Sequence, residues 1–239
     1  MGITAENLAE MFSISREDQD LFAYNSQMKA VKAQQNGILA EEICPVEIPQ
    51  RKGESIIVDQ DEFIRPDTTL EKLASLRTVF KKEGTVTAGN ASGLNDGAAA
   101  MLIVSEEALN HYGLTPKARI ITSAVVGVEP KIMGIGPVYA TRKALAKAGL
   151  TIGDMDVLEF NEAFSAQALA CTRELGLADN DPRINPNGGA IALGHPLGMS
   201  GTRIVQAATN QLLRSNGTYG LATMCVGVGM GYAMIIERM

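Results

Sequence analysis

Apolar residues along this chain change from helical spacing in the first part to strand spacing in the second. Ser15 followed by Asp18 predicts the N-terminus of a helix, because both side chains suit the unpaired N–H groups of a first turn. This helix is expected to run to about Gln35, where Asn36-Gly37 stops it. Residues 1–7 enter a helical pattern with no strand before them. The chain is therefore predicted to open with helices.

Short elements and loops alternate over the rest of the first half. A strand is predicted over 43–48, where apolar and polar residues alternate, and a helix over 70–80, where large apolar residues recur at helical spacing. A glycine- and asparagine-rich loop is expected over 85–97. The apolar run 98–104 predicts a buried strand, and a serine cap predicts a short helix over 105–112.

From residue 118 onward the pattern alternates regularly. Strands are expected over 119–128, 157–160, 219–225 and 231–237, and helices over 138–148, 162–175 and 201–214. This alternation is typical of an α/β domain. A composition shift at Thr115-Pro116-Lys117 is the best candidate for a domain boundary, and no segment repeats at a fixed period.

Composition narrows the class of protein. The 239 residues are 46% hydrophobic and 20% charged, which is typical of a globular chain. The net charge of −6 argues against nucleic acid as a partner but leaves room for an anionic small substrate on a local basic patch. No apolar run reaches the roughly 18 to 20 residues of a membrane span, and no secretory signal is recognised. Three widely spaced cysteines favour a reducing compartment, so a cytoplasmic location is expected.

A histidine between glycines, Gly194-His195-Pro196-Leu197-Gly198, is the first candidate for chemistry. The chain holds only two histidines, and glycines let a substrate approach the backbone closely. Pro196 is expected to be the first residue of a helix, and the positive end of that helix would keep the imidazole neutral. A neutral imidazole can donate a hydrogen bond to a carbonyl oxygen that gains charge. The alternative is a histidine packed in a helix-capping turn.

Cys225 is the second candidate, because Gly227, Gly229 and Gly231 follow it at alternate positions. Their N–H groups could face a substrate oxygen without obstruction by side chains, although Cys225 could also be an ordinary buried cysteine. The other two cysteines are interpreted as structural. Cys171 is in phase with an apolar helix face, and Cys44 lies among glutamates that disfavour a thiolate.

Asn161-Glu162-Ala163-Phe164 stands where a predicted strand gives way to a helix. Asn161 there is either a helix cap or a functional side chain at the carboxyl end of a strand, where α/β folds place their ligands. The loop 185–189 and the loop that contains Ser92 and Leu94 have the same ambiguity, since turn-prone residues fill both.

Several segments match one family when they are taken together. They are residues 1–7, 84–93, Asn161-Glu162-Ala163-Phe164, 185–190 running into 194–198, and Cys225 with its three glycines. This combination resembles the thiolases, the acyl-CoA acetyltransferases, over essentially the whole chain. The resemblance implies an α/β protein with the layered αβαβα thiolase fold, here an incomplete copy with a full C-terminal α/β domain. It assigns 1–94 to the later part of the thiolase loop region, 95–116 to a strand and helix of the N-terminal domain, and 117–239 to the C-terminal domain.

The resemblance also implies roles for individual residues. His195 would activate a nucleophilic cysteine and help bind the thioester oxygen, and Cys225 would be the acid or base at the α-carbon. Asn161 would hold a water in one oxyanion hole, and the Gly227 N–H would contribute to the other. The residues expected to contact the substrate are Arg65, Phe80, Ser92, Leu94, Ala163 and Phe164.

The implied reaction is reversible Claisen condensation, or CoA-dependent cleavage of a 3-ketoacyl-CoA, with acyl-CoA and CoA as substrates and no other cofactor or metal. The family suggests a homodimer or homotetramer. Segments 65–71 and 181–183 resemble the degradative 3-oxoacyl-CoA or β-ketoadipyl-CoA thiolases more than the acetoacetyl-CoA-forming ones. No cysteine here lies in the Cys-small-Ser-Gly setting of the family's nucleophile, so this chain alone is expected to lack the acylation step.

Two other functions are compatible with the absence of that nucleophile. The first is a noncatalytic CoA- or lipid-binding module of thiolase-like fold, which would have no need of His195, Cys225 and Asn161 together. The second is a cysteine hydrolase that uses Cys225 and His195. Cys225 stands at a strand end with no helix N-terminus after it to lower its pKa, which disfavours the hydrolase.

Overall fold

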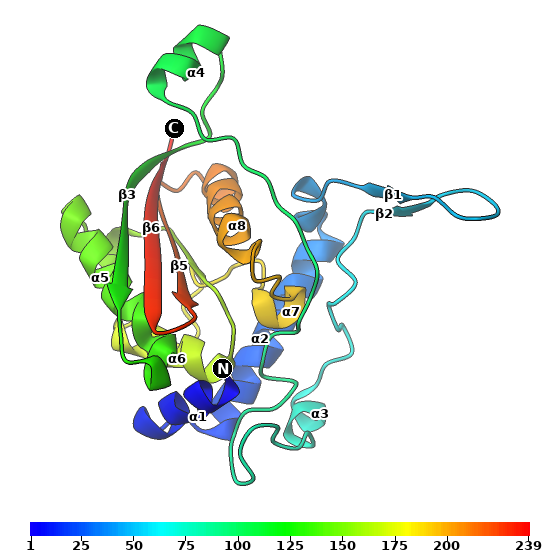
Figure 1. Cartoon of the computed structure of the whole chain (residues 1–239), viewed down its shortest axis with the longest axis vertical. Coiled ribbons are helices and arrows are strands. Elements are labelled where there is room, and N and C mark those ends of the chain that lie inside the picture. The colour runs from blue at the N-terminus through cyan, green and yellow to red at the C-terminus, as the bar shows by residue number, and fades with distance from the viewer.

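The computed structural model describes residues 1–239 and is built around a four-stranded mixed sheet with helices on both faces (Figure 1). The helices are α1 Gly2–Met11, α2 Arg16–Gln35, α3 Leu70–Ala74, α4 Glu106–Tyr112, α5 Gly136–Ala148, α6 Ser165–Glu174, α7 Ala190–Leu193 and α8 Ser200–Ser215, with short 3₁₀ turns η1 Leu39–Glu41, η2 Pro130–Ile135 and η3 Ile152–Asp154. The strands are β1 Val46–Ile48, β2 Ile56–Val58, β3 Ala118–Gly127, β4 Val157–Phe160, β5 Tyr219–Val226 and β6 Met230–Arg238.

The order of strands in the main sheet is β3-β6-β5-β4. Strands β4 and β5 run parallel, with Phe160 opposite Thr223, whereas β6 runs antiparallel to both of its neighbours. Parallel neighbours end at the same edge of a sheet. Asn161, which follows β4, and Cys225, near the end of β5, therefore lie at one edge.

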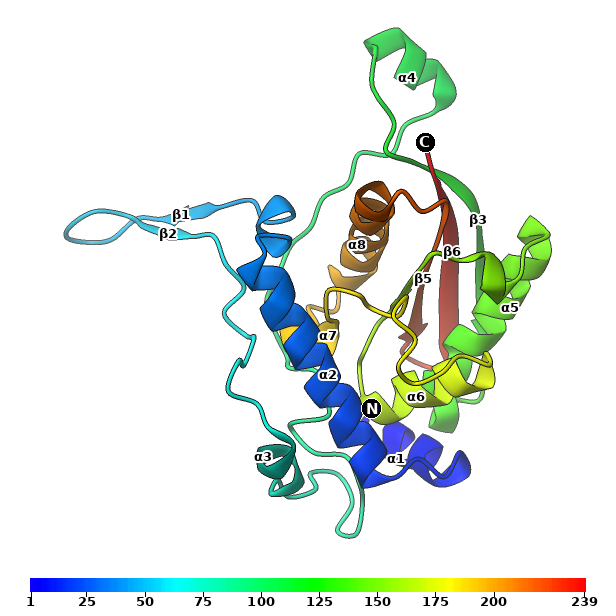
Figure 2. The same cartoon turned by 180° about the vertical axis from the view of Figure 1, so that it is seen from behind.

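The two faces of the sheet bury different sets of side chains because successive residues of a strand point to opposite sides. Leu158 and Phe160 of β4 belong to the largest hydrophobic cluster, which α5 and α6 cover. Val157 faces the other side and packs with Ala208 and Leu212 of α8. The sheet is thus enclosed by α5 on one face and α8 on the other (Figures 1 and 2).

Helices α1 and α2 and the loop 85–92 close one end of the molecule. Ser15 caps α2 as predicted, its hydroxyl oxygen accepting from the Asp18 N–H at 3.0 Å. The buried Glu6 carboxylate of α1 accepts from the N–H groups of Thr85 and Val86 and so fastens the loop to the helix. The Ser92 N–H then donates to the Ala163 carbonyl at 3.0 Å. This bond brings the loop beside the residues that follow β4.

Most predicted elements are present, but the prediction for 98–104 is wrong. This apolar run is extended, makes no ladder and is exposed, with Leu102 at 77%. A β-prone segment becomes a strand only when a neighbouring strand accepts its hydrogen bonds, and none among residues 1–239 does. The predicted helix 70–80 ends at Ala74, the strand 43–48 is limited to Val46–Ile48, and the helix 162–175 begins only at Ser165.

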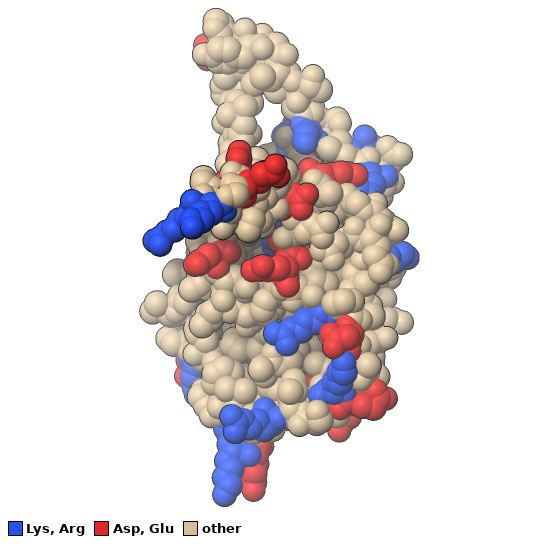
Figure 3. Space-filling model, turned by 90° about the vertical axis from the view of Figure 1, so that its right-hand side faces the viewer, with Lys and Arg blue, Asp and Glu red and all other residues tan.

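Two parts of the chain project from the body. The β1–β2 hairpin extends to one side, with every residue of both strands exposed, and α4 stands away at the end of two extended segments (Figures 1 and 2). The face drawn in Figure 3 shows Lys and Arg side chains interspersed with Asp and Glu. No helix of the structure is both long enough and apolar enough to span a membrane.

Candidate active site

Asn161 and His195, 34 residues apart in the sequence, touch at the end of β4. The Asn161 Nδ2 lies 3.2 Å from the His195 Nε2. On the other side of the ring, His195 Nδ1 lies 2.6 Å from the Ser200 Oγ, whose hydroxyl donates to the Pro196 carbonyl at 3.0 Å. Because that hydroxyl proton is used, Nδ1 carries the ring proton and donates to Ser200. Nε2 therefore presents its lone pair, as a general base requires.

The imidazole of His195 is held neutral, although for a different reason from the one expected. Burial lowers its pKa, and the positive charge of Arg203 lowers the pKa further. The expectation that Pro196 begins a helix is wrong: α8 starts at Ser200, after a turn. Burial and the charge of Arg203, and not a helix N-terminus, thus keep the His195 imidazole neutral.

A buried carboxylate ties the strand end to the loop before His195. The Glu162 Oε2 accepts from the Ser26 hydroxyl at 2.6 Å and from the Ile191 N–H at 3.2 Å, and its Oε1 accepts from the Asn185 Nδ2 at 2.7 Å. Asn185 also bonds both the N–H and the carbonyl of Phe160. These bonds join α2, β4 and α7, so they fix the position of Asn161 relative to the segment that carries His195.

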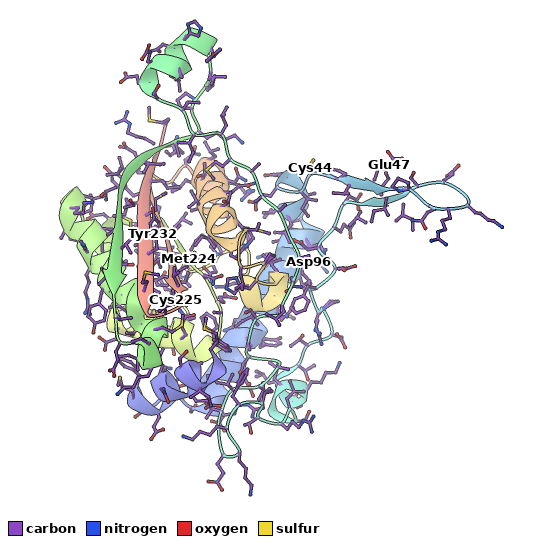
Figure 4. All side chains as sticks on the ribbon, in the orientation of Figure 1. Cys44, Glu47, Asp96, Met224, Cys225 and Tyr232 are labelled. Carbon is purple, nitrogen blue, oxygen red and sulfur yellow. The ribbon has the colours of Figure 1, made fainter.

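Cys225 is buried near the end of β5 and faces the end of the molecule that α1 covers (Figure 4). Met133, Ala163 and the half-buried Phe164 pack around it. A crevice of about 10 Å³, the space of roughly one water, opens beside it and is otherwise lined mainly by residues of α1 and η2. Burial raises the pKa of the thiol to about 11, so the sulfur holds its proton near neutral pH.

The three glycines after Cys225 serve different purposes. Around Gly227 there is open space, and its N–H donates no backbone hydrogen bond, as a group that faces a ligand would require. Gly229 has a φ of +98°, and Gly231 lies against the backbone of Gly136 so closely that a Cβ there would overlap it. The interpretation that all three face a substrate is therefore wrong for Gly229 and Gly231, which the fold itself requires.

The structure brings together four of the six residues expected to contact the substrate. Ala163 and Phe164 pack on Cys225, Ser92 bonds the Ala163 carbonyl through its N–H, and the Phe80 ring meets the Phe164 ring edge-on with 6.1 Å between centroids. The other two lie on the surface. The Arg65 guanidinium stacks over the Phe63 ring at 5.5 Å, and Leu94 is 94% exposed.

Three residues that hold the site were not singled out from the sequence. Ser200 binds the His195 ring, Glu162 carries the network described above, and the Asn95 Oδ1 accepts from the His195 N–H at 3.3 Å. Only Glu162 left a local signal, as an acidic residue two positions after a strand, where burial needs a partner. No group of three or more His, Cys, Asp or Glu side chains is placed to hold a metal ion.

The three cysteines differ in accessibility, which leads to a labelling prediction. Cys44 is exposed at the base of the hairpin, far from Cys225 (Figure 4), whereas Cys171 lies inside α6 and its thiol donates to the Gly134 carbonyl at 3.1 Å. Burial raises the pKa of Cys171 as well. With iodoacetamide near neutral pH we expect the exposed Cys44 to react first. Cys225 should react at least about 10²-fold more slowly than an ordinary thiol, because its raised pKa lowers its thiolate fraction by that factor and burial hinders the reagent further.

Mass spectrometry of the alkylated peptides at successive times measures these rates. In denaturant all three cysteines should react at similar rates, which serves as the control. Labelling of Cys225 as fast as Cys44 in the folded chain would contradict the burial of its thiol.

Comparison with known proteins adds to this geometry. Residues 1–107 match the family model of the thiolase N-terminal domain, and residues 114–238 match that of the thiolase C-terminal domain. The chain is 63% identical to a beta-ketoadipyl-CoA thiolase of Acinetobacter baylyi, over 98% of this chain and 59% of that protein. It is 54% identical to an acetyl-CoA acetyltransferase of Chromobacterium violaceum, over 100% of this chain and 60% of that protein.

Solved structures agree with these matches. The acetyl-CoA acetyltransferase of Bacillus anthracis superimposes with a TM-score of 0.96 at 47% identity, over 100% of this chain and 60% of that one. Human mitochondrial 3-ketoacyl-CoA thiolase in complex with CoA superimposes with a TM-score of 0.95 at 48% identity, over 100% of this chain and 59% of the other. The chain thus spans about three fifths of the length of the relatives that it matches.

Proposed function

The chain belongs to the thiolase family, and on that premise we propose that its site is the C-terminal share of the active site of an acyl-CoA acyltransferase that makes or cleaves 3-ketoacyl-CoA thioesters. The observation that carries this proposal is the contact of Asn161 with a neutral His195 at the same sheet edge as a protonated Cys225. A base, a donor and an acid are the groups that this chemistry needs.

Cleavage of a 3-ketoacyl-CoA would take place in two steps. A thiolate attacks the 3-keto carbon, the bond between carbons 2 and 3 breaks, and the carbanion at carbon 2 takes the proton of the Cys225 thiol to give acetyl-CoA. CoA then attacks the acyl-thioester while His195 Nε2 accepts the proton of the CoA thiol, the first thiolate leaves, and the shorter acyl-CoA forms. The proton on His195 then returns to the Cys225 thiolate, which restores the starting state. Asn161 with a bound water, and the Gly227 N–H, would stabilise the oxyanions. A thiol that keeps its proton near neutral pH is suited to the protonation step.

The acylated thiol is proposed to come from outside these 239 residues. Cys171 is enclosed in α6 with a raised pKa, and Cys44 lies at the hairpin, so neither environment supports a nucleophile. Segment 95–116 is proposed to add its exposed apolar run to a sheet of the N-terminal domain, with 1–94 as loop region and 117–239 as C-terminal domain. The complete protein is also proposed to be cytoplasmic and to assemble as a homodimer or homotetramer.

The substrate is proposed to be a 3-ketoacyl-CoA that is degraded, with 3-oxoadipyl-CoA as the first compound to test. Relatives named for that thioester are 63% and 60% identical to this chain, against 54% for the acetyl-CoA acetyltransferase. A noncatalytic binding module would not require the tautomer of His195 to be fixed through Ser200, and no observation favours it.

A chimera tests the function directly. Residues 1–239 are joined to the N-terminal segment of the Acinetobacter baylyi relative that this chain does not cover, and consumption of 3-oxoadipyl-CoA is followed with and without CoA. We expect CoA-dependent cleavage to acetyl-CoA and a shorter acyl-CoA by the chimera, and none by residues 1–239 or the added segment alone. A folded chimera that binds CoA without turnover would favour the binding module, and release of free acid without CoA would favour a hydrolase.

A further inference from the structure

Five buried polar atoms without a hydrogen-bond partner come from three residues beside the Asn161–His195 contact. They are both carboxyl oxygens of Glu159, the amide oxygen of Asn161, and the Nε and Nη2 nitrogens of Arg203. Buried polar groups are seldom left unpaired, because each unpaired group costs free energy. These atoms are complementary, with three oxygens on Glu159 and Asn161 and two donor nitrogens on Arg203.

The fold directs these three side chains toward one space. Glu159 and Asn161 are two residues apart at the end of β4, so both point to the face that α8 covers, as Val157 does. On α8, Arg203 lies one turn after Ser200, which binds the His195 ring. Two turns further along the same face of α8, Asn210 donates to Glu42 at 3.2 Å, so polar side chains follow this face as far as η1. No ion pair within 4.0 Å joins Arg203 to Glu159.

Titratable groups from several parts of the chain surround Arg203. Its guanidinium lowers the pKa values of Glu159 on β4, Glu42 after η1, and Asp61 in the loop after the hairpin, each of which burial raises. Lys29 of α2 and Glu162 act on Glu159 as well, and His195 is the remaining group that Arg203 affects. Burial raises the pKa of Glu159 to about 8, so near neutral pH this carboxyl holds a proton and can both donate and accept.

We propose that Arg203 and Glu159 are positioning residues that, bridged to the Asn161 amide oxygen by buried water, hold the Asn161 NH₂ group toward His195 Nε2. A water makes about three hydrogen bonds and can join groups that stand too far apart for a direct bond. With Oδ1 engaged on this side, Asn161 donates to His195 Nε2 and, together with Ser200 on the other side of the ring, keeps the ring proton on Nδ1. This inference rests on the proposed function, because it identifies the residues that orient Asn161 and His195, the pair on which that function depends.

The test reads the tautomer and the pKa of His195 in residues 1–239, without CoA or turnover, so it stands apart from the chimera experiment. Only two histidines are present, and the exposed His111 is an internal reference in the same ¹⁵N spectra. The unsubstituted chain should show His195 with its proton on Nδ1. Arg203→Met should move the proton toward Nε2, because the freed amide turns its oxygen to the ring and the Ser200 hydroxyl can turn from the Pro196 carbonyl to donate to Nδ1. It should also raise the His195 pKa, because a positive charge is lost.

Two further variants separate position from charge. Arg203→Lys keeps the positive charge but loses the donors at Nε and Nη2, so the His195 tautomer should shift while the His195 pKa stays low. Glu159→Gln keeps the capacity to donate and accept, so neither quantity should change. A urea midpoint for each variant confirms folding, and if Arg203→Met does not fold, Arg203→Lys decides. An unchanged tautomer in the folded Arg203 variants would overturn the proposal, as would a crystal structure with a direct, water-free ion pair between Arg203 and Glu159.

Discussion

Cys225→Ala in the chimera is expected to lower the rate of 3-oxoadipyl-CoA cleavage by about 10²- to 10⁴-fold, the usual share of a general acid or base. The thiol is the proposed proton donor to the carbanion at carbon 2, and alanine has no proton to give. Substrate binding should change little, because Cys225 contributes a small buried side chain among Met133, Ala163 and Phe164. The loss should therefore appear in kcat rather than in KM.

A second measurement separates proton transfer from the other steps. In D₂O the active chimera should exchange the α-protons of acetyl-CoA for deuterium, and Cys225→Ala should abolish this exchange. Cys44→Ser is the matched control, since Cys44 is exposed at the hairpin base and should leave both rates unchanged. Exchange that persists in Cys225→Ala would assign the proton transfer to another group.

Gly231→Ala is expected to destabilise the chain by roughly 3 kcal/mol, at the upper end of the cost of overpacking. A Cβ at Gly231 would overlap the carbonyl group of Gly136, where α5 begins, and a Cβ at Gly136 would in turn lie 2.6 Å from the Gly231 nitrogen. Both partners are backbone, so no side chain can rotate away. Strand β6 lies between β3 and β5 and is hydrogen-bonded on both sides, which prevents it from shifting.

Urea unfolding of residues 1–239 measures this loss of stability. Gly227→Ala is the control, because nothing lies within 4 Å of a Cβ there, and its free energy of unfolding should stay within about 0.5 kcal/mol of the unsubstituted chain. Since Gly231 is opposite Cys225 in the ladder, a folded Gly231→Ala chain should also label Cys225 faster. Equal midpoints for the two variants would contradict the close approach of α5 to β6.

The sequence predicted elements best where one local pattern decides the structure. Strand 157–160 was predicted at its observed bounds from a short run in which three of four residues are apolar, and all four are buried in the structure. The run 98–104 has an equally apolar pattern and yet makes no strand, because pairing depends on a neighbour that the run does not contain. Local patterns thus set what a segment prefers, and its partners decide whether that preference is realised.

The same division applies to the site. The sequence placed Asn161 and Cys225 at strand ends, and the parallel pairing of β4 with β5 brings those ends together. The sequence could not predict which contacts hold the site residues in place. The bonds of Glu162 to Ser26 and of His195 to Asn95 join residues 136 and 100 positions apart, and no spacing rule reaches that far. The causes of the neutral imidazole, burial first and the charge of Arg203 second, were missed for this reason, because both depend on residues far away in the sequence or on another element.

The alternation along β4 makes the site intolerant of changes in chain length. Leu158 and Phe160 point into the core under α5, while Glu159 and Asn161 point toward α8. Inserting or deleting one residue in this strand would turn Glu159 into the apolar core and aim Asn161 away from His195. The length of β4 is therefore fixed by the chemistry at its end as firmly as by the packing along it.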